Sequence, residues 1–215
     1  MNSRREHPRV ALLTNVLAHY RVPYFQALAQ RYPDRFGVFL TSTGMAHRAF
    51  LDTKTEVAFP VQALRGLRWH RPPADDRHLS DLRPLLRFRP DALLVGTWDE
   101  PTCVLAWLWG QLPAGPSMIQ WVESTRADRA RVEVKEAYKR MWLRGCKSIV
   151  VPGQRSREYC QILGAGDDKL FVAPNGSDRA LFSEAAKRLK PRRWALRKKL
   201  DLHGMNRDQA RAAVV

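Results

Sequence analysis

The chain has 215 residues, 45% of them hydrophobic, which is enough for one well-cored domain or a domain plus a fragment and argues against wholesale disorder. Its formal net charge of +16 favours anionic partners, whether nucleotide phosphates, anionic lipid or nucleic acid. The cysteines (Cys103, Cys146 and Cys160) form no CxxC pair and the six histidines show no metal-ligand spacing, so the sequence favours a reducing compartment over a disulfide or zinc framework.

The first third of the chain alternates apolar runs with one amphipathic segment. An apolar run over 10–16 follows three arginines, and we interpret it as a buried strand rather than a signal peptide, because polar residues interrupt it. A helix is predicted over 22–32, with Pro23 in its first turn. Strands are predicted over 36–40 and 57–61, and the Arg-, Pro- and Trp-rich segment 65–77 is predicted to be a loop.

The remaining segments continue the alternation. A helix over 79–88 is predicted to bury Leu79, Leu82, Leu85 and Leu86. Further helices are predicted over 102–112, 132–144 and 156–163, and further strands over 92–96, 117–122, 148–151 and 170–173. No apolar stretch is long enough for a membrane span, which needs about 20 residues.

This order predicts an α/β fold, a doubly wound Rossmann-like parallel sheet, followed by a basic helical extension. Ligands of such sheets bind beyond the carboxyl ends of the strands. We therefore expect functional side chains in the loops that follow the predicted strands.

The loop after the first strand contains the first candidate cleft residues, Asn15, His19, Tyr20 and Arg21. Its backbone N–H groups, His19 and Arg21 could bind acceptor or phosphate oxygens, because a guanidinium can hold an oxyanion with two hydrogen bonds. The alternative is a loop whose polar side chains bond locally.

Trp98, Asp99 and Glu100 follow the strand predicted over 92–96. An exposed Trp beside two carboxylates suits sugar binding, because the ring packs on C–H faces and the carboxylates accept hydroxyl hydrogen bonds. Asp99 could instead cap the next helix, with Pro101 in its first turn.

Glu123, Ser124 and Arg126 follow the strand predicted over 117–122. A carboxylate at this place could orient a hydroxyl or act as a base, which makes Glu123 the candidate catalytic residue. It could also pair with Arg126 or Arg129.

Two basic segments remain. The residues around the helix predicted over 132–144 could lie on an anionic membrane or form a solvated face. Residues 187–199 hold eight basic and no acidic residues, which suits a nucleic-acid or lipid patch or an uncovered interdomain helix.

Four segments occur together in a recognisable order. They begin at Leu13 (LTNVLAHYRVPYF), Pro90 (PDALLVGTW), Ile149 (IVVPG) and Leu163 (LG). The third is followed by Ser156 and Tyr159, and the last by VAPNGSD from Val172 and by Phe182. Together they resemble the N-terminal domain of family-4 glycosyltransferases. In that family the pattern Pro-Asn-Gly-x-Asp-x-x-x-Phe marks the crossing between two domains, and the matching residues here are Pro174, Asn175, Gly176, Asp178 and Phe182.

The resemblance implies the acceptor-side half of a GT-B fold over residues 1–182, with residues 183–215 as the start of the nucleotide-sugar-binding domain. It implies retaining transfer of a sugar from a nucleotide diphospho-sugar to a glycan or lipid-linked acceptor in surface polysaccharide or glycolipid synthesis. No further cofactor is expected, and the location implied is cytoplasmic or on the inner membrane face.

Two features separate the chain from that pattern. Many family members carry a His where Glu123 stands, and the diphosphate-binding residues of the second domain would come after residue 215, so we expect residues 1–215 alone to be inactive. The alternatives are a non-catalytic α/β module that binds a glycan, lipid or protein, and a basic nucleic-acid-binding protein.

Overall fold

A computed structural model describes residues 8–15, 17–18, 21–41, 57–69, 77–128 and 131–175, which all belong to one compact unit, Met1–Ser177. The predictions for residues 183–215 lie outside the described residues. Apart from two strands between residues 66 and 80, the strands and helices of this part of the chain follow the order that the sequence predicts.

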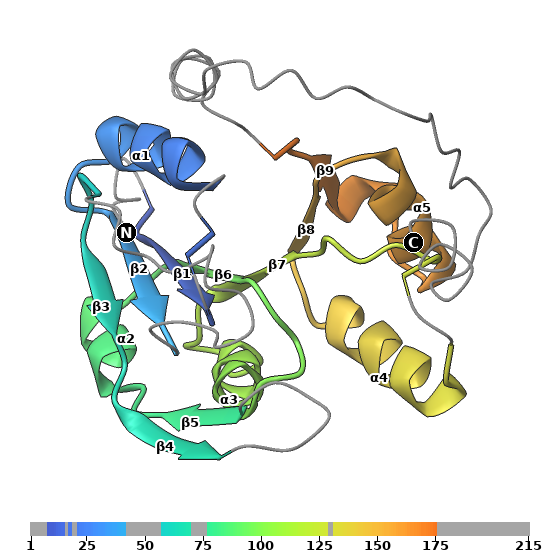
Figure 1. The fold of residues 1–215 in the computed structure, drawn as a ribbon, viewed down its shortest axis with the longest axis horizontal. Helices are drawn as coiled ribbons and strands as arrows, with labels where there is room; N and C mark the ends of the chain where they lie inside the picture. Colours follow the sequence, from blue (N-terminus) through green and yellow to red (C-terminus); the bar gives the residue numbers. More distant parts are fainter. Residues whose placement is uncertain are drawn as a thin grey trace, which may run out of the picture. The chain divides into compact units, whose positions relative to one another are not determined.

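The described residues contain one parallel sheet of seven strands (Figure 1). The strands are β1 (Val10–Thr14), β2 (Phe36–Leu40), β3 (Val61–Ala63), β6 (Ala92–Val95), β7 (Ser117–Trp121), β8 (Ser148–Val151) and β9 (Leu170–Val172). Their spatial order is β3-β2-β1-β6-β7-β8-β9, and every neighbouring pair is parallel. The chain therefore winds outward from β1 in one direction and then crosses to β6, which confirms the doubly wound α/β prediction.

Both faces of the sheet are covered. The helices are α1 (Val22–Arg31), α2 (Arg83–Phe88), α3 (Pro101–Gly110), α4 (Glu133–Arg144) and α5 (Gln154–Ile162), with a 3-10 turn at Asp167–Lys169. Val22 and Phe25 of α1 pack in one apolar cluster, and residues of the other four helices pack in a second.

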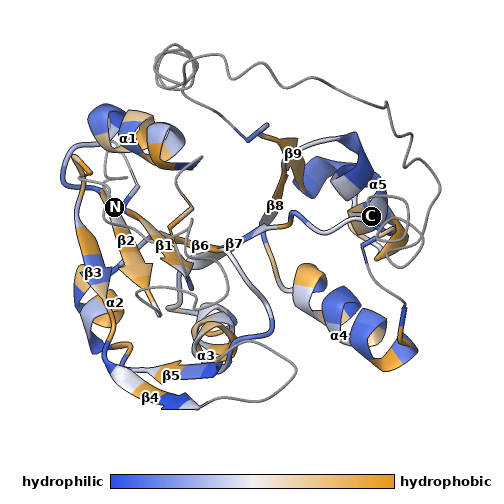
Figure 2. Cartoon of the chain, in the orientation of Figure 1, coloured by the Kyte–Doolittle hydropathy of each residue, from blue (hydrophilic) through white to orange (hydrophobic). Residues whose placement is uncertain are grey.

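Strand β1 shows why residues 10–13 are all apolar. Ala11 and Leu13 belong to the cluster of α2–α5, whereas Leu12 belongs to the cluster of α1. Successive side chains of a strand point to opposite faces, so a strand with two covered faces has no position that faces solvent. Figure 2 shows this hydropathy on the inner strands, and the helices carry polar residues on part of their surface.

The segment predicted as a loop contains an antiparallel pair instead. Strands β4 (Gly66–Trp69) and β5 (Arg77–Ser80) pair with each other, with Arg68 opposite His78. All four residues of β4 are exposed, so its sequence lacks the apolar alternation that marks a half-buried strand. Gly66 suits the pairing, because a Cβ there would overlap the backbone of Leu79 and Ser80.

The helix predicted from residue 79 begins four residues later. Leu79 lies in β5 and is exposed, and α2 begins at Arg83 with Pro84 in its first turn. Of the four leucines predicted to face inward, Leu85 is fully buried and Leu86 is 44% exposed. Leu79 therefore pairs with β4 as part of a strand, although the spacing of the four leucines is that of a helix. The strand predicted over 57–61 also begins later, at Val61.

Candidate functional site

Three loops of the described residues bring polar side chains together beyond the carboxyl ends of β1, β7 and β9. Arg21 ends the loop after β1, Glu123 follows β7 by two residues, and Asn175 follows β9 by three. Because the strands are parallel, these ends lie at one edge of the sheet, where doubly wound folds bind ligands.

Glu123 is the centre of this cluster. Its Oε1 lies 2.5 Å from Arg21 Nη2 and also accepts hydrogen bonds from Arg21 Nε at 3.2 Å and Asn175 Nδ2 at 3.0 Å. The side chain of Glu123 is 35% exposed, whereas that of Arg21 is 10% exposed. The carboxylate is therefore held by one cation and one amide and still faces solvent.

The local chain explains why Arg21 is placed so firmly. It occupies the N-cap position of α1, its N–H donates to Ala18 O at 2.9 Å, and Pro23 follows in the first turn. Its guanidinium lies over the Trp121 ring, 5.1 Å from the ring centroid. The face of an aromatic ring attracts a cation, so this contact favours the observed position of Arg21. On the other side, Ser156 Oγ donates to Glu123 O at 3.2 Å.

A second set of hydrogen-bonded side chains holds the loop after Glu123 in place. Asp128 accepts bonds from Thr125 N and Oγ1, both at 2.6 Å, and Arg131 donates to the Thr125 and Arg126 carbonyls. Arg131 Nη1 also donates to Tyr159 Oη at 2.9 Å. Arg126, which the sequence predicts to be a cleft residue, is exposed.

Tyr159 and Glu136 anchor that group to α4 and α5. Tyr159 is 1% exposed, and its hydroxyl donates to Glu136 Oε2 at 2.9 Å and accepts from Lys139 Nζ at 2.8 Å. Burial would raise the pKa of Glu136, but the hydrogen bonds from Lys139 and Tyr159 and the charges of Lys139 and Arg131 leave that pKa lowered. These residues position the loop rather than line the cluster.

The Trp98–Glu100 segment differs from the exposed sugar platform that the sequence suggests. Trp98 is half-buried against the core, its carbonyl accepts from Tyr138 Oη at 2.6 Å, and Lys139 Nζ lies 5.2 Å from its ring centroid. The helix cap is Glu100, not Asp99. Asp99 instead pairs with Arg77 at 3.3 Å and accepts a hydrogen bond from Thr97 Oγ1.

Glu100 is buried, with 4% of its surface exposed. Its Oε2 lies 2.7 Å from Thr41 Oγ1 at the end of β2, and its Oε1 has no hydrogen-bond partner among the described residues. Burial, opposed by the Thr41 hydrogen bond, raises its pKa to about 7. This carboxyl group is therefore only partly ionised at neutral pH.

Buried polar atoms that lack a partner are few in this part of the chain: Glu100 Oε1 and Trp121 Nε1. Both belong to residues at the carboxyl edge of the sheet, one after β6 and one at the end of β7. Unpaired buried polar atoms are costly, and these two lie at the same edge of the sheet as the Glu123 cluster.

The other predicted site residues are less informative. Asn15 and Ser124 are half-buried and Pro174 is exposed. His19, Tyr20, Gly176, Asp178 and Phe182 lie outside the described residues. Within the described part, no group of three potential metal ligands occurs, and no helix is long and apolar enough to cross a membrane.

The sequence analysis named Ser156 only within a family-like segment and did not single out Thr41 or Trp121. Thr41 and Trp121 each lie at the end of a predicted strand, so strand-end position was a usable signal. Nothing in their residue types distinguishes them from ordinary core or cap residues.

No protein-family model matches this chain, and no curated protein matches it. Among solved structures, Anabaena Alr3699/HepE in complex with UDP aligns with a TM-score of 0.52 and 15% identity, over 84% of this chain and 50% of that one. The complex of the same protein with UDP-glucose aligns with a TM-score of 0.50 and 14% identity, over 85% of this chain and 50% of that one.

The chain thus spans half the length of the structures it matches, and at this identity the likeness is one of fold. A parallel sheet with helices on both faces is what one Rossmann-like half of a GT-B protein contains. The described residues are therefore similar in fold to part of Alr3699/HepE and consistent with one half of a GT-B fold.

Proposed function

We propose that this chain is the acceptor-side part of a glycosyltransferase that moves a sugar from a nucleotide diphospho-sugar to an acceptor hydroxyl. The observation that carries the proposal is the Arg21–Glu123–Asn175 cluster at the carboxyl edge of a doubly wound sheet. A partly exposed carboxylate held at such an edge can accept hydrogen bonds from a hydroxyl-bearing ligand.

In this proposal Glu123 orients the acceptor hydroxyl. Arg21 and Asn175 both bond to its Oε1, so one side of the carboxylate is fixed and the group keeps a defined orientation. Positioning of this kind lowers the barrier because the reacting oxygen is already placed beside the sugar carbon that it attacks. Whether Glu123 also takes the proton, as the sequence suggested, stays a prediction.

The nucleotide sugar as donor is supported by the fold comparison, since the Anabaena protein was solved with UDP and with UDP-glucose. Membership of family 4, retention of configuration, and a role in surface polysaccharide or glycolipid synthesis on the inner membrane face are further parts of the proposal. The inner membrane face follows from the basic charge of the chain, and the other parts follow from the sequence resemblance. We also propose that residues 1–215 alone turn over little nucleotide sugar, since they match half of the length of that protein.

Binding of residues 1–215 to a glycan array tests the proposal. We expect wild-type protein to bind a subset of glycans, and Glu123→Ala to lose at least about tenfold in affinity for them, because it removes a charged acceptor of hydrogen bonds. Glu158→Ala is the matched control, since Glu158 is an exposed carboxylate on α5. Equal binding by Glu123→Ala and Glu158→Ala would contradict the proposal.

Two companion measurements separate the alternatives. UDP release from UDP-glucose should stay near background for residues 1–215, and turnover that Glu123→Ala abolishes would overturn the expectation of inactivity. Binding to random-sequence duplex DNA with a steep salt dependence, and no glycan binding, would favour the nucleic-acid alternative.

A further inference from the structure

Helix α3 is almost entirely apolar, and yet one side of it is exposed. Residues 101–122 contain no Asp, Glu, Lys or Arg, and Leu105 and Leu108 of α3 are 45% and 50% exposed. Leu112, in the turn after the helix, is 59% exposed. A helix that is apolar on all sides is normally buried, so an exposed side of it is typical of a surface that binds an apolar partner.

Helix α4 lies next to α3 and exposes further apolar side chains. The Trp107 ring of α3 stacks on the Trp142 ring of α4, with 5.2 Å between the ring centroids. Both rings belong to the same apolar cluster, so the two helices cover the same side of the sheet. Val134 and Met141, seven positions apart and therefore on one side of α4, are 79% and 48% exposed. Figure 2 shows apolar and polar residues together on this helix.

The exposed charges of α4 and of the turn after it are mostly positive. Lys135, Arg144 and Lys147 are exposed, and none of them forms an ion pair with a residue that the structure describes. The exposed acid of the helix, Glu133, is paired with Arg140. Unpaired cations therefore accompany the exposed apolar residues of the two helices.

We propose that the exposed faces of α3 and α4 bind the surface of an anionic lipid bilayer. The apolar side chains enter the boundary between headgroups and acyl chains, and the cations pair with lipid phosphates. This α3–α4 surface comprises Leu105, Leu108, Leu112, Val134, Met141, Lys135, Arg144 and Lys147.

Charge complementarity favours a bilayer over the other partners of an apolar surface. A second copy of this chain would bring the same cations together, in a protein whose net charge is already +16. A nucleic acid would attract the cations but would leave the exposed leucines, Val134 and Met141 in water. An anionic bilayer offers both negative headgroups and an apolar interior.

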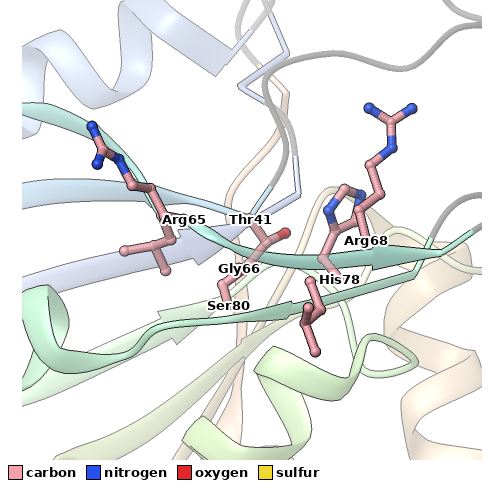
Figure 3. A pocket seen from close by; sticks show the side chains of 8 residues that line it. Thr41, Arg65, Gly66, Arg68, His78 and Ser80 are labelled. Atoms are coloured by element: carbon pink, nitrogen blue, oxygen red, sulfur yellow. The ribbon is translucent and has the colours of Figure 1, made fainter.

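The hollow beside the β4–β5 pair differs from the α3–α4 surface. Its volume is about 300 Å³, and Figure 3 shows that Arg65 and Arg68 extend from it in different directions. A broad partner cannot enter a hollow of this size, whereas it can lie along the exposed faces of two neighbouring helices. The α3–α4 surface is therefore the part of the described chain that suits a bilayer.

The α3–α4 surface is connected to the transfer reaction, a step that rests on the proposed function. The loop that follows Glu123 leads into α4, and Arg131 at the end of this loop donates to the Thr125 and Arg126 carbonyls. One tethered loop thus joins the candidate site to the surface. A lipid-linked acceptor is the substrate class that brings its hydroxyl to a protein bound at a bilayer.

Sedimentation of residues 1–215 with phosphatidylcholine vesicles, with and without phosphatidylglycerol, tests the proposal. We expect binding only when phosphatidylglycerol is present, and weaker binding as salt rises. Arg144→Ala and Lys147→Ala should each weaken binding about fivefold, which is the effect of one basic residue near an anionic surface. Leu108→Gln should weaken binding about tenfold, because it removes an apolar side chain that passes from water into lipid.

Two exposed residues on the other side of the sheet are matched controls. Arg31 is in the last turn of α1, which packs in the other apolar cluster. Phe171 is 55% exposed and follows Leu170 of the α2–α5 cluster, so the alternation of β9 points Phe171 to the opposite side. Arg31→Ala and Phe171→Gln should each change vesicle binding less than about twofold. Circular dichroism melting curves of all variants verify that the fold is kept.

Hydrogen exchange gives a readout that needs no substitution. The amides of α3 and α4 should exchange more slowly with phosphatidylglycerol vesicles, and those of α1 should not change. Equal weakening by Arg31→Ala and Arg144→Ala would overturn the proposal, because the whole basic chain would then attract the vesicles. A dimer that Leu108→Gln disperses, or DNA binding without vesicle binding, would assign another partner and overturn it as well.

Glu123→Ala separates this proposal from the transfer proposal. It should bind vesicles as wild type does, and Leu108→Gln should bind the soluble glycans of the array as wild type does. Absence of vesicle binding together with intact glycan binding would overturn only the membrane proposal. Vesicle binding without glycan binding would contradict only the transfer proposal.

Discussion

Glu100 and Glu123 follow neighbouring strands of the same sheet, β6 and β7, but lie in different surroundings. Glu123 is partly exposed and bonded to Arg21 and Asn175. Glu100 is 4% exposed, is bonded to the Thr41 hydroxyl, and has one oxygen without a partner among the described residues. Position at a strand end places a carboxyl group near the ligand edge, but burial and the available cation decide its charge.

The largest effect that we expect is that of Glu100→Gln on the pH dependence of the free energy of unfolding. The pKa of Glu100 is raised from 4.5 to about 7 in the folded protein, so the folded state binds more protons than the unfolded state between those values. The free energy of unfolding should therefore fall as pH rises from 4.5 to 7 and stay low above it, by about 3 kcal/mol at most.

Gln keeps the shape of the neutral carboxyl group and cannot ionise. Urea denaturation should therefore show Glu100→Gln to be more stable than wild type at pH 8 and nearly equal to it at pH 4.5. If the two proteins differ by the same amount at both pH values, Glu100 is not the buried acid that the structure indicates.

The next effect concerns Thr102, which ties β5 to α3. Thr102→Val removes the hydroxyl that accepts from Ser80 N and donates to His78 O, so two buried backbone groups each lose one hydrogen bond. We expect a loss of about 2 kcal/mol in the free energy of unfolding. Thr102→Ser keeps the hydroxyl and should recover most of that loss in the same urea titration.

The smallest effect that we expect is the loss of stability when the Arg21–Glu123 ion pair is removed. Glu123→Gln keeps an oxygen that can accept from Arg21 and Asn175 but removes the charge, and the pair is partly solvated. We expect a loss of about 1 kcal/mol by urea denaturation at low salt, which shrinks at high salt because exposed charges are screened. A cost as large as the effect of Glu100→Gln would mean that the two carboxyl groups are less different than their surroundings indicate.

Much of the fold could be predicted because its strands are buried on both faces. The runs around Leu12, Leu94 and Ile149 are apolar at successive positions, which is typical of strands in a parallel sheet that is covered on both faces. The β4–β5 pair could not be predicted in this way. Its exposed side chains carry no burial pattern, and its pairing depends on contacts across residues distant in sequence.

The site was predicted in part. The polar residues after β1 and β7 were identifiable by their place behind apolar runs, and Arg21 and Glu123 do meet there. The sequence suggested Arg126 or Arg129 as partners of Glu123, because these are its neighbours in the chain. Among the described residues the charged partner of Glu123 is Arg21, 102 positions away, because the ends of parallel strands lie at one edge of the sheet. Arg129 lies outside the described residues.

The sequence by itself therefore determined the alternation of strands and helices, the doubly wound sheet, and the strand ends at which the candidate site residues lie, because hydrophobic burial leaves a pattern along the chain. Only the tertiary structure decided that Glu100 is buried and that Glu123 is paired with Arg21. Charge state and pairing depend on solvent exposure and on distances between residues far apart in sequence, which no local pattern specifies.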